Sequence, residues 1–120
     1  MVLVDTSVWV QHLRQGSHDL VRLLNDGQVV CHSFVVGELA CGNLRNRSEI
    51  LVLLNSLPRA ETATPEEVLQ FIDTYRLMGK GLGYVDIHLL ASAVLTGVEF
   101  WTLDKRLRQA AIRLDLARIE

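Results

Sequence analysis

Four acidic residues in this chain could cooperate in metal-dependent chemistry: Asp5, Glu38, Asp86 and Asp104. Clustered carboxylates repel one another, and a divalent cation relieves that repulsion. Mg²⁺ and Mn²⁺ are hard cations that prefer carboxylate and water oxygens. The sequence offers no histidine placed to activate a serine nucleophile and no glycine-rich phosphate loop. The set therefore predicts hydrolysis of a phosphoester bond by a water molecule activated on Mg²⁺ or Mn²⁺.

Each of these carboxylates also has a possible structural explanation. Asp5 and Asp104 stand between a predicted strand and a predicted helix, where Asp is a favoured N-cap residue. Asp86 lies in a first helical turn, where the helix dipole stabilises a negative charge. Glu38 lies in the middle of a predicted helix with apolar neighbours, so we expect it to be buried. A buried carboxylate is costly unless it is paired or binds a metal, which makes Glu38 the strongest indication of a site.

Short apolar segments alternate with longer amphipathic ones along the whole chain. We expect strands at residues 2–4, 28–31 and 98–103, with weaker strands at 59–62 and 117–119. We expect helices at residues 6–15, 18–25, 33–44, 47–57, 65–78, 85–95 and 105–114. This alternation predicts an α/β fold, a three-layer α/β/α sandwich with a central parallel sheet, and residues 1–120 should form one domain. Ligands of such sheets bind beyond the carboxyl ends of the strands, where Asp5 and Asp104 are expected.

The composition is that of an ordinary globular protein, with 49% hydrophobic and 22% charged residues. No apolar run reaches the length of a membrane helix, and the N-terminus does not resemble a secretory leader, so we expect a cytoplasmic protein. Cys31 and Cys41 lie in apolar segments and are expected to be buried free thiols. The histidines and cysteines have no ligand spacing that favours zinc.

The charge balance at first argues against a nucleic-acid partner. The formal net charge is −2, whereas proteins that bind nucleic acids through phosphate contacts are usually basic. The four carboxylates account for four negative charges, so the rest of the chain carries a net charge of +2. A basic rim around the site could come from seven cationic residues, or these could be ordinary surface: Arg14, Arg45, Arg47, Lys80, Lys105, Arg106 and Arg108.

Four segments resemble the motifs of the PIN-domain family, and more narrowly the VapC-type ribonuclease toxins of type II toxin–antitoxin systems. Residues 3–8 (LVDTSV) resemble the first motif, an Asp at a strand end followed by hydroxyl residues. Residues 33–40 (SFVVGELA) resemble the second, residues 85–93 (VDIHLLASA) the third and residues 101–107 (WTLDKRL) the fourth. The four occur in the family's order and span most of the chain, and every acidic position of the family is occupied.

The resemblance implies a metal-dependent endoribonuclease in which one set of residues holds Mg²⁺ or Mn²⁺: Asp5, Glu38, Asp86 and Asp104. Thr6 or Ser7, together with Thr102, would hydrogen-bond to metal-bound water or to the carboxylates. The family's products carry a 5′-phosphate and a 3′-hydroxyl. We further expect a structured RNA to be recognised by its shape and loop bases.

The resemblance also implies protein partners. Family members form homodimers, and a VapB-like antitoxin silences them by placing a C-terminal segment in an apolar groove. Trp9, Val10 and Leu13 could line such a groove. The alternative is that they belong to the core, as the apolar stripe of an amphipathic helix normally does.

Other functions remain possible on the sequence alone. A haloacid-dehalogenase-type phosphatase also has an Asp after its first strand, but it needs a second Asp two residues later, where this chain has Ser7. A PIN domain could instead serve as an inactive scaffold that only binds RNA or protein. A third possibility is a PIN nuclease of RNA maturation that works without an antitoxin.

Overall fold

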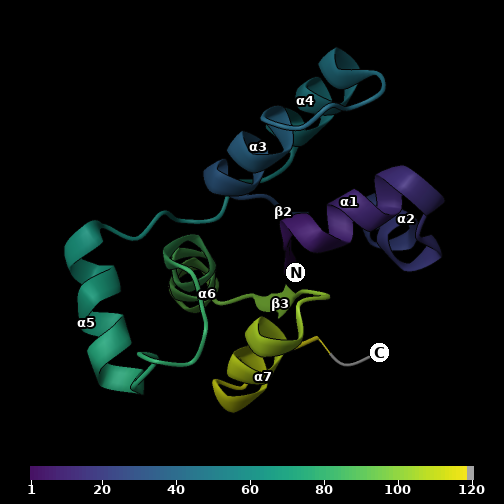
Figure 1. Cartoon of the computed structure of the whole chain (residues 1–120). Coiled ribbons are helices and arrows are strands. Elements are labelled where there is room, and N and C mark those ends of the chain that lie inside the picture. Colours follow the sequence, from purple (N-terminus) through teal and green to yellow (C-terminus); the bar gives the residue numbers. More distant parts are fainter. Residues whose placement is uncertain (119–120) are drawn as a thin grey trace.

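The computed structural model describes residues 1–118, which fold around a small parallel sheet (Figure 1). The strands are β1 (Val2–Val4), β2 (Val29–Val30) and β3 (Glu99–Trp101). They lie in the order β2-β1-β3, and β1 pairs with both neighbours in parallel. Helices flank this sheet, so the predicted α/β fold with a central parallel sheet is confirmed.

The helices agree closely with those predicted. They are α1 (Thr6–Gln15), α2 (His18–Asn25), α3 (Ser33–Ala40), α4 (Arg47–Ser56), α5 (Pro65–Tyr75), α6 (Tyr84–Thr96) and α7 (Lys105–Arg113). In Figure 1, α3 and α4 extend side by side away from the sheet, while α5 packs outside α6. No helix within residues 1–118 is long and apolar enough to cross a membrane.

Some predicted boundaries were too generous. The helix expected at residues 33–44 ends at Ala40, because the chain turns at Cys41 and Gly42. The weak strand expected at 59–62 is a single bridge between Cys31 and Arg59. The strand expected at 117–119 is a bridge between Phe100 and Ala117, and residue 119 lies outside the described part of the chain.

The core is centred on β1, all three residues of which are buried. A strand that is covered on both faces needs apolar residues at every position, which explains the sequence Val-Leu-Val. Trp9 belongs to this core, with a relative exposure of 1%. Cys31 is also buried, but Cys41 is exposed, so the prediction of two buried thiols was wrong for Cys41.

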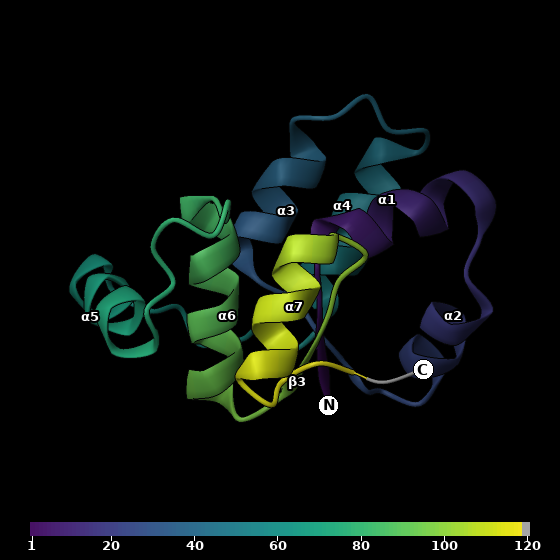
Figure 2. The ribbon, with the colours of Figure 1, turned by 60° about the horizontal axis from the view of Figure 1, so that its bottom comes forward.

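The carboxyl end of the sheet is where the predicted site residues meet. Figure 2 shows β1 running from the N-terminus to the start of α1, with α6 and α7 starting at that same end. Asp5 is the N-cap of α1 and Asp104 the N-cap of α7. Asp86 lies in the first turn of α6. The parallel sheet thus brings together residues that are about 100 positions apart in sequence.

Candidate active site

Asp5 is the most firmly held of the four carboxylates. It is buried, with a relative exposure of 6%. Its Oδ2 atom accepts hydrogen bonds from Ser7 Oγ and Thr102 Oγ1, both at 2.7 Å. The backbone N–H of Asp5 donates to the carbonyl of Trp101 at 2.9 Å, which joins β1 to β3 at this point. The Asp5 side chain makes no capping bond to α1.

The two hydroxyls beside Asp5 also organise the loop that follows β3. Ser7 Oγ and Thr102 Oγ1 lie 3.3 Å apart. Ser7 Oγ accepts the N–H of Leu103 at 3.0 Å, and Thr102 Oγ1 accepts the N–H of Asp104 at 3.1 Å. Both hydroxyls therefore connect α1 to the segment that carries Asp104, as well as fixing the orientation of Asp5.

Glu38 reaches the site from α3, where Thr6 Oγ1 donates to its Oε1 atom at 2.6 Å. The expectation that Glu38 is buried was wrong, because its side chain is exposed. In α3 the buried residues are Val35 and Leu39. Successive residues of a helix are rotated by about 100°, so Glu38 lies off the buried stripe although its neighbours in sequence are apolar. The cost of burying its charge therefore gives no support for a metal site.

Asp86 is half-buried at the start of α6, where its Oδ2 accepts the N–H of Gly83 at 3.1 Å. Burial raises the pKa of Asp86, and the hydrogen bond from Gly83 opposes that rise. The negative charges of Asp5 and Asp104 raise the pKa of Asp86 further. Asp86 therefore lies within the electric field of two of the other site carboxylates.

Asp104 is exposed, and its structural explanation is confirmed. Its Oδ1 accepts the N–H of Leu107 at 2.9 Å, which is the hydrogen bond of a helix N-cap. This capping role does not use the whole carboxylate, because Oδ2 has no hydrogen-bond partner within residues 1–118.

The four carboxylates are chemically suited to a hard divalent cation, but their oxygens are not yet positioned to bind one together. Each site carboxylate uses one oxygen in the hydrogen bonds described above and leaves the other without a protein partner within residues 1–118. Carboxylate oxygens are the donors that Mg²⁺ and Mn²⁺ prefer. Across this part of the chain, however, no three His, Cys, Asp or Glu side chains are close enough to hold a metal ion as they stand. Metal binding would require side-chain rotation at the exposed members of the set.

The residues of the predicted basic rim are all exposed, and the four of them that line pockets are divided between two pockets. Arg14 and Arg45 border a pocket between α1 and the loop after α3. Lys80 and Arg106 border a different pocket beside α7. Arg47 donates through Nε and Nη2 to the carbonyl of Ala40, so it stabilises the α3–α4 turn.

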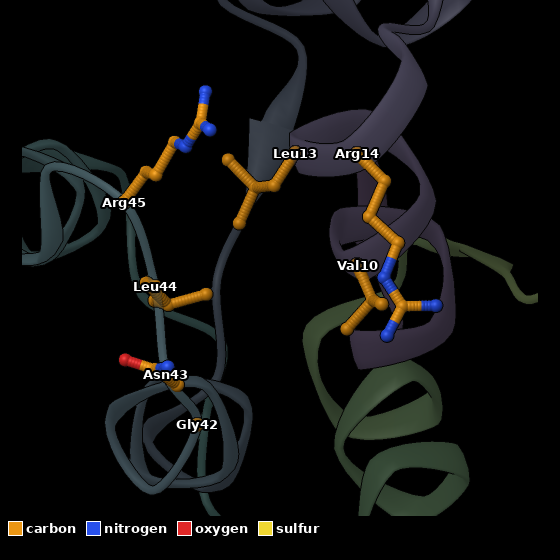
Figure 3. Close-up of a pocket in the computed structure, with 7 residues that line it drawn as sticks. All are labelled: Val10, Leu13, Arg14, Gly42, Asn43, Leu44 and Arg45. Carbon is orange, nitrogen blue, oxygen red and sulfur yellow. The ribbon is translucent and has the colours of Figure 1, made fainter.

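Two of the three residues predicted to line a groove on α1, Val10 and Leu13, border a pocket. Figure 3 shows Val10 and Leu13 of α1 facing Leu44 across a pocket of about 520 Å³, with Arg14 and Arg45 at its border. Trp9 does not line this pocket, and its burial confirms the alternative that it belongs to the core.

Two features near the site were not predicted. The N–H of Gly83, in the turn before α6, donates to Asp86, and nothing in the sequence indicated this contact. Arg113 lines the pocket with Lys80 and Arg106 but was absent from the predicted rim. Helical periodicity could have identified Arg113, because a residue seven positions after Arg106 lies on the same face of a helix.

Comparison with known proteins identifies the family. The family model named PIN domain matches residues 2–113 of this chain. Ribonuclease VapC32 of Mycobacterium tuberculosis, from strains CDC 1551 / Oshkosh and H37Rv, is 45% identical over 121 residues, which cover 100% of this chain and 98% of the relative. The chain therefore belongs to the PIN-domain family.

Solved structures agree on the fold. FitAcB from Neisseria gonorrhoeae superposes with a TM-score of 0.69 at 21% identity, covering 100% of this chain and 97% of that chain. PAE2754 from Pyrobaculum aerophilum gives a TM-score of 0.62 at 17% identity, covering 95% of this chain and 88% of that chain.

Proposed function

We propose that this protein is an endoribonuclease toxin of the VapC type, which hydrolyses phosphodiester bonds of RNA and is silenced by an antitoxin. The observation that supports the proposal is that Asp5, Asp86 and Asp104 interact electrostatically at the carboxyl end of the parallel sheet, while Thr6, the residue after Asp5, binds Glu38. This arrangement occurs in a chain that is 45% identical, over its full length, to a protein named a ribonuclease.

The four carboxylates are proposed to hold Mg²⁺ or Mn²⁺ through their oxygens that lack protein partners. The bound cation supplies an activated water and neutralises charge on the scissile phosphate. Asp5 is the fixed member, because Ser7 and Thr102 hold its Oδ2 and so orient Oδ1. Thr6 orients Glu38 in the same way from the neighbouring helix.

Without a cation this site would repel RNA. The phosphate backbone is negatively charged, and four carboxylates at one edge of the sheet oppose its approach. Burial is the main reason that the pKa of Asp86 is raised, and the negative charges of Asp5 and Asp104 add to that rise. Metal dependence is therefore proposed from the charge of the site as well as from the chemistry of hydrolysis.

The test compares cleavage of total RNA by the wild type and by Asp5→Asn, with Mg²⁺, Mn²⁺ or EDTA present. Asp73→Asn is the matched control, because Asp73 is an exposed aspartate on α5, outside the site. We expect metal-dependent cleavage by the wild type and the control but not by Asp5→Asn. A folded, antitoxin-free wild type that cleaves no RNA with either metal would instead favour the binding scaffold.

The antitoxin is proposed to bind the pocket formed by Val10, Leu13 and Leu44. The pocket has apolar walls and two arginines at its border, so it suits an apolar segment with acidic groups beside it. A homodimer, which the resemblance to VapC-type toxins implies, and a cytoplasmic location belong to the same proposal. An adjacent small open reading frame for an antitoxin would separate this function from RNA maturation.

A further inference from the structure

A small basic pocket lies along α7, the helix that begins directly after Asp104. It has a volume of about 190 Å³ and is lined by Lys80, Arg106, Gln109, Ala110 and Arg113. Lys80 comes from the turn before α6, and the others come from α7. Positions 106, 109, 110 and 113 follow the spacing i, i+3, i+4, i+7, which places their side chains on one face of the helix.

The two segments that form the pocket, α7 and the turn before α6, adjoin the site residues Asp104 and Asp86. Arg106 follows Asp104, the N-cap of α7, by two residues. The side chain of Arg106 lies directly over Gly81, so closely that a Cβ atom at Gly81 would collide with the guanidinium. Gly81 also has a φ of +76°, which other residues rarely adopt. Two residues later, Gly83 donates its N–H to Asp86.

The cations of this pocket have no acidic partner among the residues that the structure describes. Lys80, Arg106 and Arg113 form no ion pair with any carboxylate of residues 1–118, where the one ion pair found is that of Arg22 with Asp19. Arg113 does donate from Nη2 to the carbonyl of Tyr75 at 2.7 Å, which orients it without neutralising its charge. Three converging positive charges in a chain of net charge −2 create a local anion-binding potential.

We propose that this pocket binds a backbone phosphate of the RNA substrate, beside the phosphate that is cleaved. The inference rests on the proposed ribonuclease function and identifies where the substrate is held. Phosphate contacts fix the register and direction of a nucleic acid without reading its sequence. Arg106 and Lys80 would thus set the path of the strand from the carboxylates along α7. The small volume suits a phosphate group better than a whole organic ligand.

The experiment measures RNA binding without cleavage. The probe is a fluorescein-labelled single-stranded RNA of mixed sequence, bound by antitoxin-free protein carrying Asp5→Asn, with anisotropy read over a range of salt concentrations. Lys80→Gln and Arg106→Gln are each added to this background. Arg22→Gln is the control, because it removes one positive charge from an exposed residue on α2.

We expect each pocket substitution to weaken binding several-fold, and to lower the slope of log K against log salt by about 0.7, the value for one single-strand phosphate contact. Arg22→Gln should leave the slope unchanged. Arg106→Lys retains the charge and should retain most of the slope.

Two results would overturn the inference. The first is that Lys80→Gln and Arg106→Gln, with melting temperatures equal to that of their parent, bind RNA with the affinity and slope of Arg22→Gln. The second is that they lose affinity for poly-glutamate while RNA binding is unaffected, which would assign the pocket to an acidic protein segment. Failure of the ribonuclease function would look different, since the wild type would then cleave no RNA while binding still depended on the pocket.

Discussion

The buried imidazole of His32 should make the stability of this protein depend on pH. The ring has a relative exposure of 0%. Its Nδ1 accepts the N–H of Phe34 at 2.9 Å, so the proton of the neutral ring is on Nε2, which lies 3.0 Å from Ser92 Oγ. Burial, and then the positive charges of His88 and Arg59, lower the pKa of His32 from 6.5 to about 4. A second proton on Nδ1 would break the bond from Phe34 and bury a charge.

The magnitude follows from the difference between the folded and unfolded pKa. In the unfolded chain His32 takes up a proton near pH 6.5, whereas in the folded protein it does so only near pH 4. Its contribution to stability is therefore complete above pH 6.5 and is lost as the pH falls towards 4. The loss corresponds to about 3 kcal/mol of unfolding free energy.

The assay is urea unfolding of the wild type and of His32→Asn, from about pH 7.5 down to about pH 4. Asparagine can still accept the N–H of Phe34 as an N-cap residue but does not titrate. The wild type should be the more stable at neutral pH, and this difference should shrink by up to about 3 kcal/mol at the acidic end. His18→Asn, at an exposed histidine, is the control. A difference between the wild type and His32→Asn that stays constant over the whole range would refute the reasoning.

Other substitutions test the site and its surroundings. Thr102→Val removes the hydroxyl that donates to Asp5. Urea unfolding should show that the free energy of unfolding falls by about 2 kcal/mol, and RNA cleavage should fall roughly tenfold or more. Unchanged cleavage would contradict a positioning role for Thr102. Mn²⁺ should raise the melting temperature of the wild type, by the equivalent of about 2.7 kcal/mol at a hundredfold excess over Kd; Asp73→Asn should respond equally and Asp5→Asn should not. Leu13→Asp should weaken antitoxin capture in a pull-down while the protein still cleaves RNA, and normal capture would remove the groove proposal. Trp9→Ala should cost about 3–5 kcal/mol of stability in urea unfolding, because it empties the core rather than a binding surface.

The fold and the position of the site could be predicted because local signals and the parallel sheet agree. The run Val-Leu-Val before Asp5 is apolar at every position, as a strand covered on both faces requires. Asp104 marks the start of α7, where it accepts the N–H of Leu107. Once these two strand ends are identified, the geometry of a parallel sheet places both aspartates at one edge.

The burial of individual side chains was harder to predict. Glu38 has apolar neighbours in sequence, but α3 is apolar on more than one side, so the pattern does not show which face packs on the core. Cys41 was expected to be buried for the same reason, although the helix ends just before it. Where nearly every residue of a segment is apolar, periodicity has no contrast from which to assign a face.

Contacts between distant segments left no signal in the sequence. The side chain of Arg106 in α7 packs on Gly81, in the turn before α6, and neither residue type predicts this contact. The spacing between the site carboxylates depends on side-chain rotation, which motifs do not specify. Residue types could therefore indicate a metal site, but only the structure shows whether the carboxylates lie close enough together to hold a metal ion.

The outer edges of the sheet bear on how this protein behaves without a partner. The outer strand β2 is only two residues long. Beyond the outer strands, single bridges join Cys31 to Arg59 on one side of the sheet and Phe100 to Ala117 on the other. Long unpaired strands offer a template on which other chains can add, whereas short and covered edges do not. A toxin that is free of its antitoxin has these edges exposed to a crowded solution. The short length of these strands should therefore protect the protein from edge-to-edge aggregation when no partner covers it.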